Sequence, residues 1–79
     1  MAKSLREQFG RDVREARLRA GLSQTEVGKT TGKGQTYVSE IELGLANLTL
    51  DTMFLIAQSV GLEVVMTTRP LPPKSPRQK

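Results

Sequence analysis

Apolar residues near the start of the chain recur at the three- and four-residue spacing of an amphipathic helix. The stripe consists of Leu5, Phe9, Val13, Ala16 and Ala20. Ser4 and Glu7, which come just before and within its first turn, have the spacing of a capping box. Gly21 suits the left-handed conformation that ends many helices. The pattern predicts a first helix that begins at Ser4 and ends at Gly21.

A second, shorter helix is indicated between Ser23 and Gly32. Ser23 and Glu26 repeat the capping-box spacing, and Val27 is the main apolar residue. Gly28 costs about 1 kcal/mol relative to alanine inside a helix. We therefore expect another helix to approach closely at Gly28, where a Cβ atom would not fit.

Two further helices complete the helical part of the chain. Lys33 and Gly34 form a turn, and the third helix runs from about residue 35 to 43. Its inward residues are Val38 and Ile41, and Gly44 ends it. The fourth helix is capped by Thr49 and stopped by Gly61. Its predicted core face is Leu50, Met53, Phe54, Ile56 or Ala57, and Val60.

The pattern changes after Gly61, because residues 62–69 are rich in β-branched side chains and roughly alternate. One strand needs a partner for its backbone N–H and C=O groups, and no other segment resembles a strand. The same strand of a second copy would supply it across a two-fold axis. The predicted dimer interface is Leu62, Val64, Val65 and Met66. The alternative is an irregular or helical segment packed on its own subunit.

The predicted organisation is therefore an all-α, four-helix domain in residues 1–61, a dimerisation strand in 62–69 and a basic, proline-rich tail in 70–79. The net charge is +4, and Lys74, Arg77 and Lys79 in the tail leave +1 for residues 1–69. Because residues 1–69 carry so little net charge, they can bind nucleic acid only if a few of their cations are positioned to contact it.

Composition also excludes several classes of function. The chain has no histidine and no cysteine, which removes the commonest general base, thiolate metal sites and disulfides. We expect no enzymatic activity, no metal and no cofactor. The sequence contains neither a signal peptide nor a long apolar run, so a cytoplasmic protein is expected, which would be nucleoid-associated if it binds DNA.

The third helix carries polar side chains suited to base recognition in a major groove. At 100° per residue Thr36 and Glu40 share a face, Gln35 lies beside them, and Val38 and Ile41 face the core. Gln35 can bind adenine in a bidentate manner, Thr36 can contact a thymine methyl, and Glu40 can accept from cytosine N4. The alternative for Glu40 is an exposed carboxylate paired with an arginine of the first helix.

Other residues of the same region are candidates for phosphate binding. Gln24 lies near the start of the second helix, where backbone N–H groups favour an anion. Lys33 adds a positive charge in the turn. Ser39 either contacts phosphate or packs, and for Tyr37 a partly structural role is favoured. Glu42 points away from the base-reading face, and we expect it to form an intramolecular ion pair, for which Arg17 is one candidate partner.

These features together resemble the Cro/C1-type helix-turn-helix family, also called the XRE family. The resemblance covers residues 9–62 and is carried by Phe9, Gly10, Val13, Arg17, Gly21-Leu22-Ser23-Gln24, Glu26-Val27, Gly32, Val38-Ser39, Ile41-Glu42, Gly44, Leu50, Ile56-Ala57 and Gly61-Leu62. It implies a small lambda-repressor-like domain that binds double-stranded DNA, with Gln35, Thr36 and Glu40 on bases and Gln24 on phosphate. The departures are Thr31, Lys33 and Leu48, which put the conformation of residues 31–34 in doubt.

The segment after the fourth helix is similar to that of HipB-type antitoxin repressors, in which a strand pairs across the dimer. This resemblance implies a homodimeric regulator, in which autoregulation by repression is expected, with a toxin protein as an additional partner. Restriction–modification controller proteins and phage-type repressors belong to the same family and are the alternatives.

Overall fold

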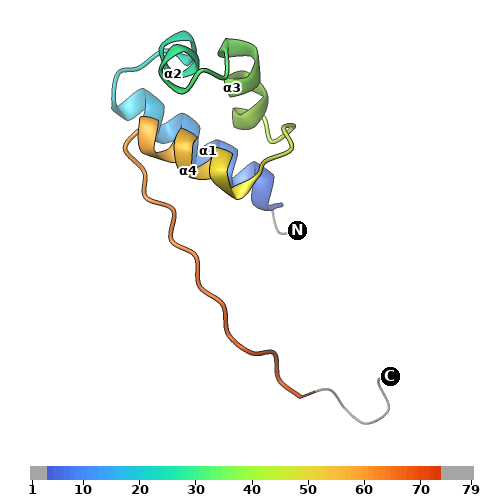
Figure 1. Cartoon of the computed structure of the whole chain (residues 1–79). Coiled ribbons are helices and arrows are strands. Elements are labelled where there is room, and N and C mark those ends of the chain that lie inside the picture. The colour runs from blue at the N-terminus through green and yellow to red at the C-terminus, as the bar shows by residue number, and fades with distance from the viewer. Residues whose placement is uncertain (1–3, 74–79) are drawn as a thin grey trace.

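Four helices form the body of the molecule in the computed structural model, which describes residues 4–73. They are α1 (Leu5–Arg19), α2 (Gln24–Thr31), α3 (Gln35–Glu42) and α4 (Leu50–Ser59). Helices α2 and α3 lie together on one side of the body (Figure 1), where α2 packs on α3 and α4 and α3 packs on α1. Within the described residues, no helix is both long enough and apolar enough to cross a membrane.

The core lies where these helices meet, and each of them contributes to it. Its buried residues are Val13, Ala16, Val27, Val38, Ile41, Ala46, Ile56 and Val60. Full burial of one such aliphatic side chain contributes about 1.5–3 kcal/mol. Val38 and Ile41 thereby fix one face of α3, while Gln35, Thr36 and Glu40 on this helix are exposed.

The predicted caps are confirmed. The backbone N–H of Glu7 donates to Ser4 Oγ at 3.2 Å, and that of Glu26 donates to Ser23 Oγ at 3.0 Å. The glutamate carboxylates accept in return, so both capping boxes are complete. Thr49 Oγ1 accepts from the backbone N–H of Thr52 at 3.1 Å at the start of α4.

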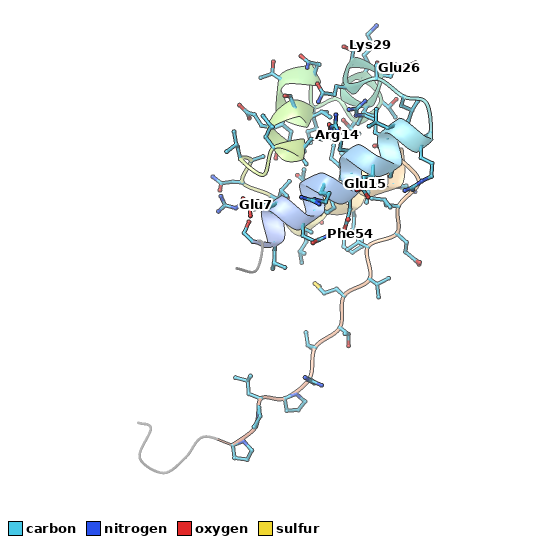
Figure 2. All side chains as sticks on the ribbon, turned by 180° about the vertical axis from the view of Figure 1, so that it is seen from behind. Glu7, Arg14, Glu15, Glu26, Lys29 and Phe54 are labelled. Carbon is cyan, nitrogen blue, oxygen red and sulfur yellow. The ribbon has the colours of Figure 1, made fainter. Side chains whose placement is uncertain are left out.

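Two of the residues predicted to be in the core are exposed, as is Leu5 of the first apolar stripe. Leu5 is 86% exposed, Phe54 is 46% exposed and Leu50 is 49% exposed. Figure 2 shows Phe54 at the opposite end of the body from Glu26 and Lys29 of α2. No described helix buries these three side chains. The prediction that Leu50 and Phe54 form part of the monomer core was wrong.

The predicted strand of residues 62–69 is not formed in the described chain. Residues 62–73 adopt neither helix nor strand and run away from the body (Figure 1). A strand requires a second strand to accept and donate its backbone hydrogen bonds, and residues 4–73 contain no other. Of the proline-rich tail of 70–79, only residues 70–73 are described, and the cations Lys74, Arg77 and Lys79 lie outside the described residues.

Candidate nucleic-acid interface

The turn between α2 and α3 is built on close contact between two glycines. A Cβ atom on Gly28 would lie 2.6 Å from the carbonyl carbon of Gly34 and 2.8 Å from the backbone nitrogen of Gln35. The backbone N–H groups of Lys33 and Gly34 donate to the Gly28 carbonyl oxygen at 3.1 and 3.3 Å. The close approach expected at Gly28 is thus confirmed, and it fixes the start of α3 against α2.

The departures from the family pattern in residues 31–34 leave this turn well defined. Thr31 Oγ1 donates to the Val27 carbonyl oxygen at 2.8 Å, so the hydroxyl is satisfied within α2. Gly32 ends α2 in the left-handed conformation with φ 71°, and Gly34 begins α3 with φ 87°. Lys33 lies between them with its side chain exposed, so its ammonium group is available to an anion.

The outward face of α3 carries the residues predicted to contact bases. Gln35, Thr36 and Glu40 are all exposed, whereas Val38 and Ile41 on the other face are buried. Among the side chains of residues 4–73, Glu40 forms no ion pair, so the alternative pairing with an arginine of α1 is not formed. The three side chains form an exposed polar face on a helix held from behind.

The buried ion pair of Arg17 with Glu42 holds α1 against α3. Arg17 Nε donates to Glu42 Oε2 at 2.6 Å and Nη2 donates to Glu42 Oε1 at 3.0 Å. The side chains are only 10% and 3% exposed, respectively. Arg17 Nη1 also donates to the Leu22 carbonyl oxygen at 2.9 Å. The hydrogen bond to Glu42 raises the pKa of Arg17 and burial opposes this shift, so the guanidinium remains charged. The pairing predicted from the sequence is confirmed.

Gln24 connects this ion pair to the exposed face of α3. Gln24 Nε2 donates to Glu42 Oε1 at 3.1 Å, and Gln24 Oε1 accepts from Gln35 Nε2 at 2.7 Å. The sequence predicts that Gln24 and Gln35 belong to one interface, but it predicts neither a contact between them nor a role of Glu42 there. The sequence carries no local signal for these contacts, because each joins two different helices.

Tyr37 and Ser39 are less exposed than the base-reading residues. The Tyr37 hydroxyl donates to the Asn47 carbonyl oxygen at 3.0 Å and so ties α3 to the loop before α4. Because that hydroxyl has a single hydrogen, this bond leaves it no donor for a phosphate oxygen. Ser39 is half-buried.

The residues predicted to form the dimer interface border an apolar groove. The groove has a volume of about 500 Å³ and is lined by Leu5, Gln8, Phe9, Asp12, Leu50, Met53, Ala57 and residues 62–66. Leu62 and Val64 are half-buried, whereas Val65 is 82% exposed and Met66 is 60% exposed. This side of the molecule therefore presents apolar surface far from the polar face of α3.

Comparison with known proteins identifies relatives over most of the chain. A helix-turn-helix family model matches residues 13–65. The control protein C.BamHI of Bacillus amyloliquefaciens is 33% identical over 64 residues, which are 80% of this chain and 79% of that protein.

Solved structures share the fold. The restriction-modification controller protein C.AhdI of Aeromonas hydrophila is 31% identical, with a TM-score of 0.68 over 73% of this chain and 84% of that one. The clp gene regulator ClgR of C. glutamicum has a TM-score of 0.76 over 81% of this chain and 82% of that one. At 23% identity, the likeness to ClgR concerns the fold alone.

Proposed function

Because this chain belongs to the helix-turn-helix family of DNA-binding transcriptional regulators, we propose that it binds one specific operator through the exposed face of α3. The observation that carries the proposal is the exposure of Gln35, Thr36 and Glu40 on a helix whose other face is buried. An α-helix fits the major groove, where each base pair displays its own pattern of donors and acceptors. We assign base contacts to these three side chains.

Phosphate contacts would set the position of α3 in the groove. Lys33 is exposed in the turn, and Gln24 retains one amide N–H beyond its bond to Glu42. Contacts of this kind fix register and orientation without reading sequence. Ser39 is a further candidate at the edge of the same face. We assign Tyr37 to holding the loop before α4, because its hydrogen is donated to Asn47.

A homodimer would place two such helices on one DNA site. The exposed apolar side chains of Val65 and Met66, together with the groove beside them, support burial against a second copy. Pairing of residues 62–69 across a two-fold axis would also satisfy their backbone hydrogen-bonding groups. The two α3 helices would then read half-sites about 34–36 Å apart in a pseudo-palindromic operator.

Regulation of its own gene is the expected outcome of this binding. The test is fluorescence anisotropy on the DNA immediately upstream of this gene, against a scrambled duplex, at about 150 mM salt. A preference of roughly a thousandfold or more, at two subunits per site, is expected for an autoregulating repressor. Equal, weak and salt-sensitive binding to both duplexes would contradict it.

The assignment of Gln35 is tested by the Gln35→Ala variant on the same duplexes. Loss of a bidentate contact should weaken operator binding by about 1–3 kcal/mol and relax preference at one base pair in each half-site. Lys33→Ala is the matched control, since loss of a phosphate contact should weaken binding to all sequences alike and reduce its salt dependence. Unchanged sequence preference in Gln35→Ala would show that α3 does not read bases as proposed.

Control of a restriction–modification gene pair is the second candidate. It is favoured by the similarity to C.BamHI at 33% identity and to C.AhdI at 31% identity. These relatives are controller proteins, so they favour this alternative over the antitoxin role implied by the HipB resemblance. Specific binding upstream of a restriction or modification gene next to this one would support it. Specific binding confined to other promoters would reject it.

A further inference from the structure

We propose that Glu42, although buried behind the base-reading face, is a positioning residue for DNA specificity that sets the direction of the Gln35 amide through Gln24. The proposal rests on the proposed function, because it concerns how Gln35 selects its base. It adds to the recognition site a carboxylate that would touch no DNA.

The contacts form a continuous chain from the core to the surface. Glu42 Oε1 accepts from Gln24 Nε2 at 3.1 Å, and Gln24 Oε1 accepts from Gln35 Nε2 at 2.7 Å. At the buried end, Arg17 donates to both carboxylate oxygens of Glu42. Arg17 and Glu42 are held in the core, Gln24 is half-buried, and only Gln35 is exposed.

The chemistry of Glu42 gives this chain one direction. A primary amide has a donor end and an acceptor end that nearly superimpose when the group turns over, so its direction depends on its neighbours. An ionised carboxylate only accepts, so Gln24 must turn its NH₂ group toward Glu42. The Gln24 oxygen then faces Gln35 and requires the NH₂ group of Gln35 in turn. Turning over either amide would bring two acceptor oxygens together.

The result is a defined donor–acceptor pattern on Gln35. Among residues 4–73, its Oε1 and its second N–H have no hydrogen-bond partner and are left for a base. Adenine offers one donor and one acceptor in the major groove, whereas guanine offers two acceptors at N7 and O6. An amide whose direction is fixed complements adenine, while an amide free to turn over can also place its NH₂ group against guanine.

The test removes the carboxylate without leaving a charge in the core. The double substitution Arg17→Met with Glu42→Met replaces the buried pair by apolar side chains, a change that proteins often tolerate. Base preference is measured at every position by selection from a randomised DNA duplex library. We expect adenine-over-guanine preference at the Gln35 position to fall by about fivefold or more, with the other positions unchanged. Glu15→Met, on the exposed face of α1 (Figure 2), is the control that should keep the wild-type profile.

A purely structural role of the ion pair predicts another result. Weaker binding with an unchanged base profile in the double variant would overturn the proposal. Gln24→Leu alters only a half-exposed side chain and should fold even if the double variant does not. It should relax preference at the same base pair, and retention of full adenine preference in Gln24→Leu would also overturn the proposal.

A second readout does not depend on any operator. The side-chain NH₂ group of Gln35 gives two proton signals, and donation of one proton to Gln24 moves that signal away from its free-glutamine shift, which NMR measures in the protein without DNA. The Gln35 shifts should move toward free-glutamine values in Gln24→Leu, which removes the partner of the bond. They should also move in the double variant, although the two methionines replace residues that do not touch Gln35. Unmoved Gln35 signals in the double variant would overturn the proposal. Absence of specific DNA binding with moved signals would instead overturn the proposed function.

Discussion

Arg17 shows how one buried residue connects three parts of the fold. Its guanidinium donates to Glu42 on α3 and to the Leu22 carbonyl between α1 and α2. Removing one partner of a buried ion pair leaves the other charge without compensation, which usually costs about 3–5 kcal/mol. Arg17 therefore contributes to stability well beyond the range of a surface ion pair.

We predict that Arg17→Met alone lowers the free energy of unfolding by about 3–5 kcal/mol, as measured by urea denaturation. Because the pKa of Arg17 is raised, its stabilisation is fully present below the ordinary arginine pKa and is lost only as pH rises through the raised value. The loss caused by the substitution should accordingly be the same at pH values of about 7 and about 9. A loss below about 1 kcal/mol would show that the pair behaves as an exposed one.

At the scale of elements, the contact between α2 and the start of α3 depends on the missing side chain of Gly28. Alanine would normally stabilise a helix by about 1 kcal/mol relative to glycine. Here its Cβ atom would lie 2.6 Å from the Gly34 carbonyl carbon, and backbone cannot turn aside as a flexible side chain can. Packing therefore outweighs helix propensity at this position.

Gly28→Ala should thus reduce the free energy of unfolding by about 1–3 kcal/mol, the usual cost of overpacking. It should also weaken operator binding, because α3 would be displaced from α2. Thr30→Ala, an exposed position on the same helix, is the control and should be neutral or slightly stabilising. Equal stability of Gly28→Ala and wild type would mean that the two helices separate without cost.

The elements also show which information the sequence carries. Ser4 and Ser23 were identified as helix caps from residues three positions away, because a cap is a local interaction. The assignment of Leu50 and Phe54 to the core is wrong, because periodicity tells which residues share a helix face but not whether another element covers that face. The link between Gln24 and Gln35 was missed for the related reason that it depends on how α2 and α3 pack.

For the whole molecule, an apolar groove beside residues 62–66 is left open to solvent. The groove beside residues 62–66 and the exposed side chains of Leu5 and Phe54 leave apolar area in water. Burial of such area contributes roughly 25 cal/mol per Å², so a second copy that covered it would stabilise both partners. The fraction of dimer and the free energy of unfolding should then both rise with protein concentration.

We predict that Val64→Asp lowers both dimerisation and operator affinity, because it places a charge in the apolar face of the proposed ribbon. Sedimentation equilibrium and anisotropy measure the two effects. Thr67→Asp adds the same charge at an exposed position of the same segment and serves as the control. A Val64→Asp variant that remains fully dimeric would reject the ribbon, although not the helix-turn-helix.

The bond between Gln35 and Gln24 has a consequence for anyone who wishes to retarget this protein to a new operator. The exposed face of α3 looks as if it could be redesigned separately, because Gln35, Thr36 and Glu40 lie outside the buried contacts of Val38 and Ile41. Position 35, however, shares its amide with a residue on another helix. In a library of variants in which only α3 is randomised, most new side chains at position 35 would lie beside a Gln24 with which they form no hydrogen bond. Successful variants should come from libraries in which positions 24 and 35 are randomised as a pair.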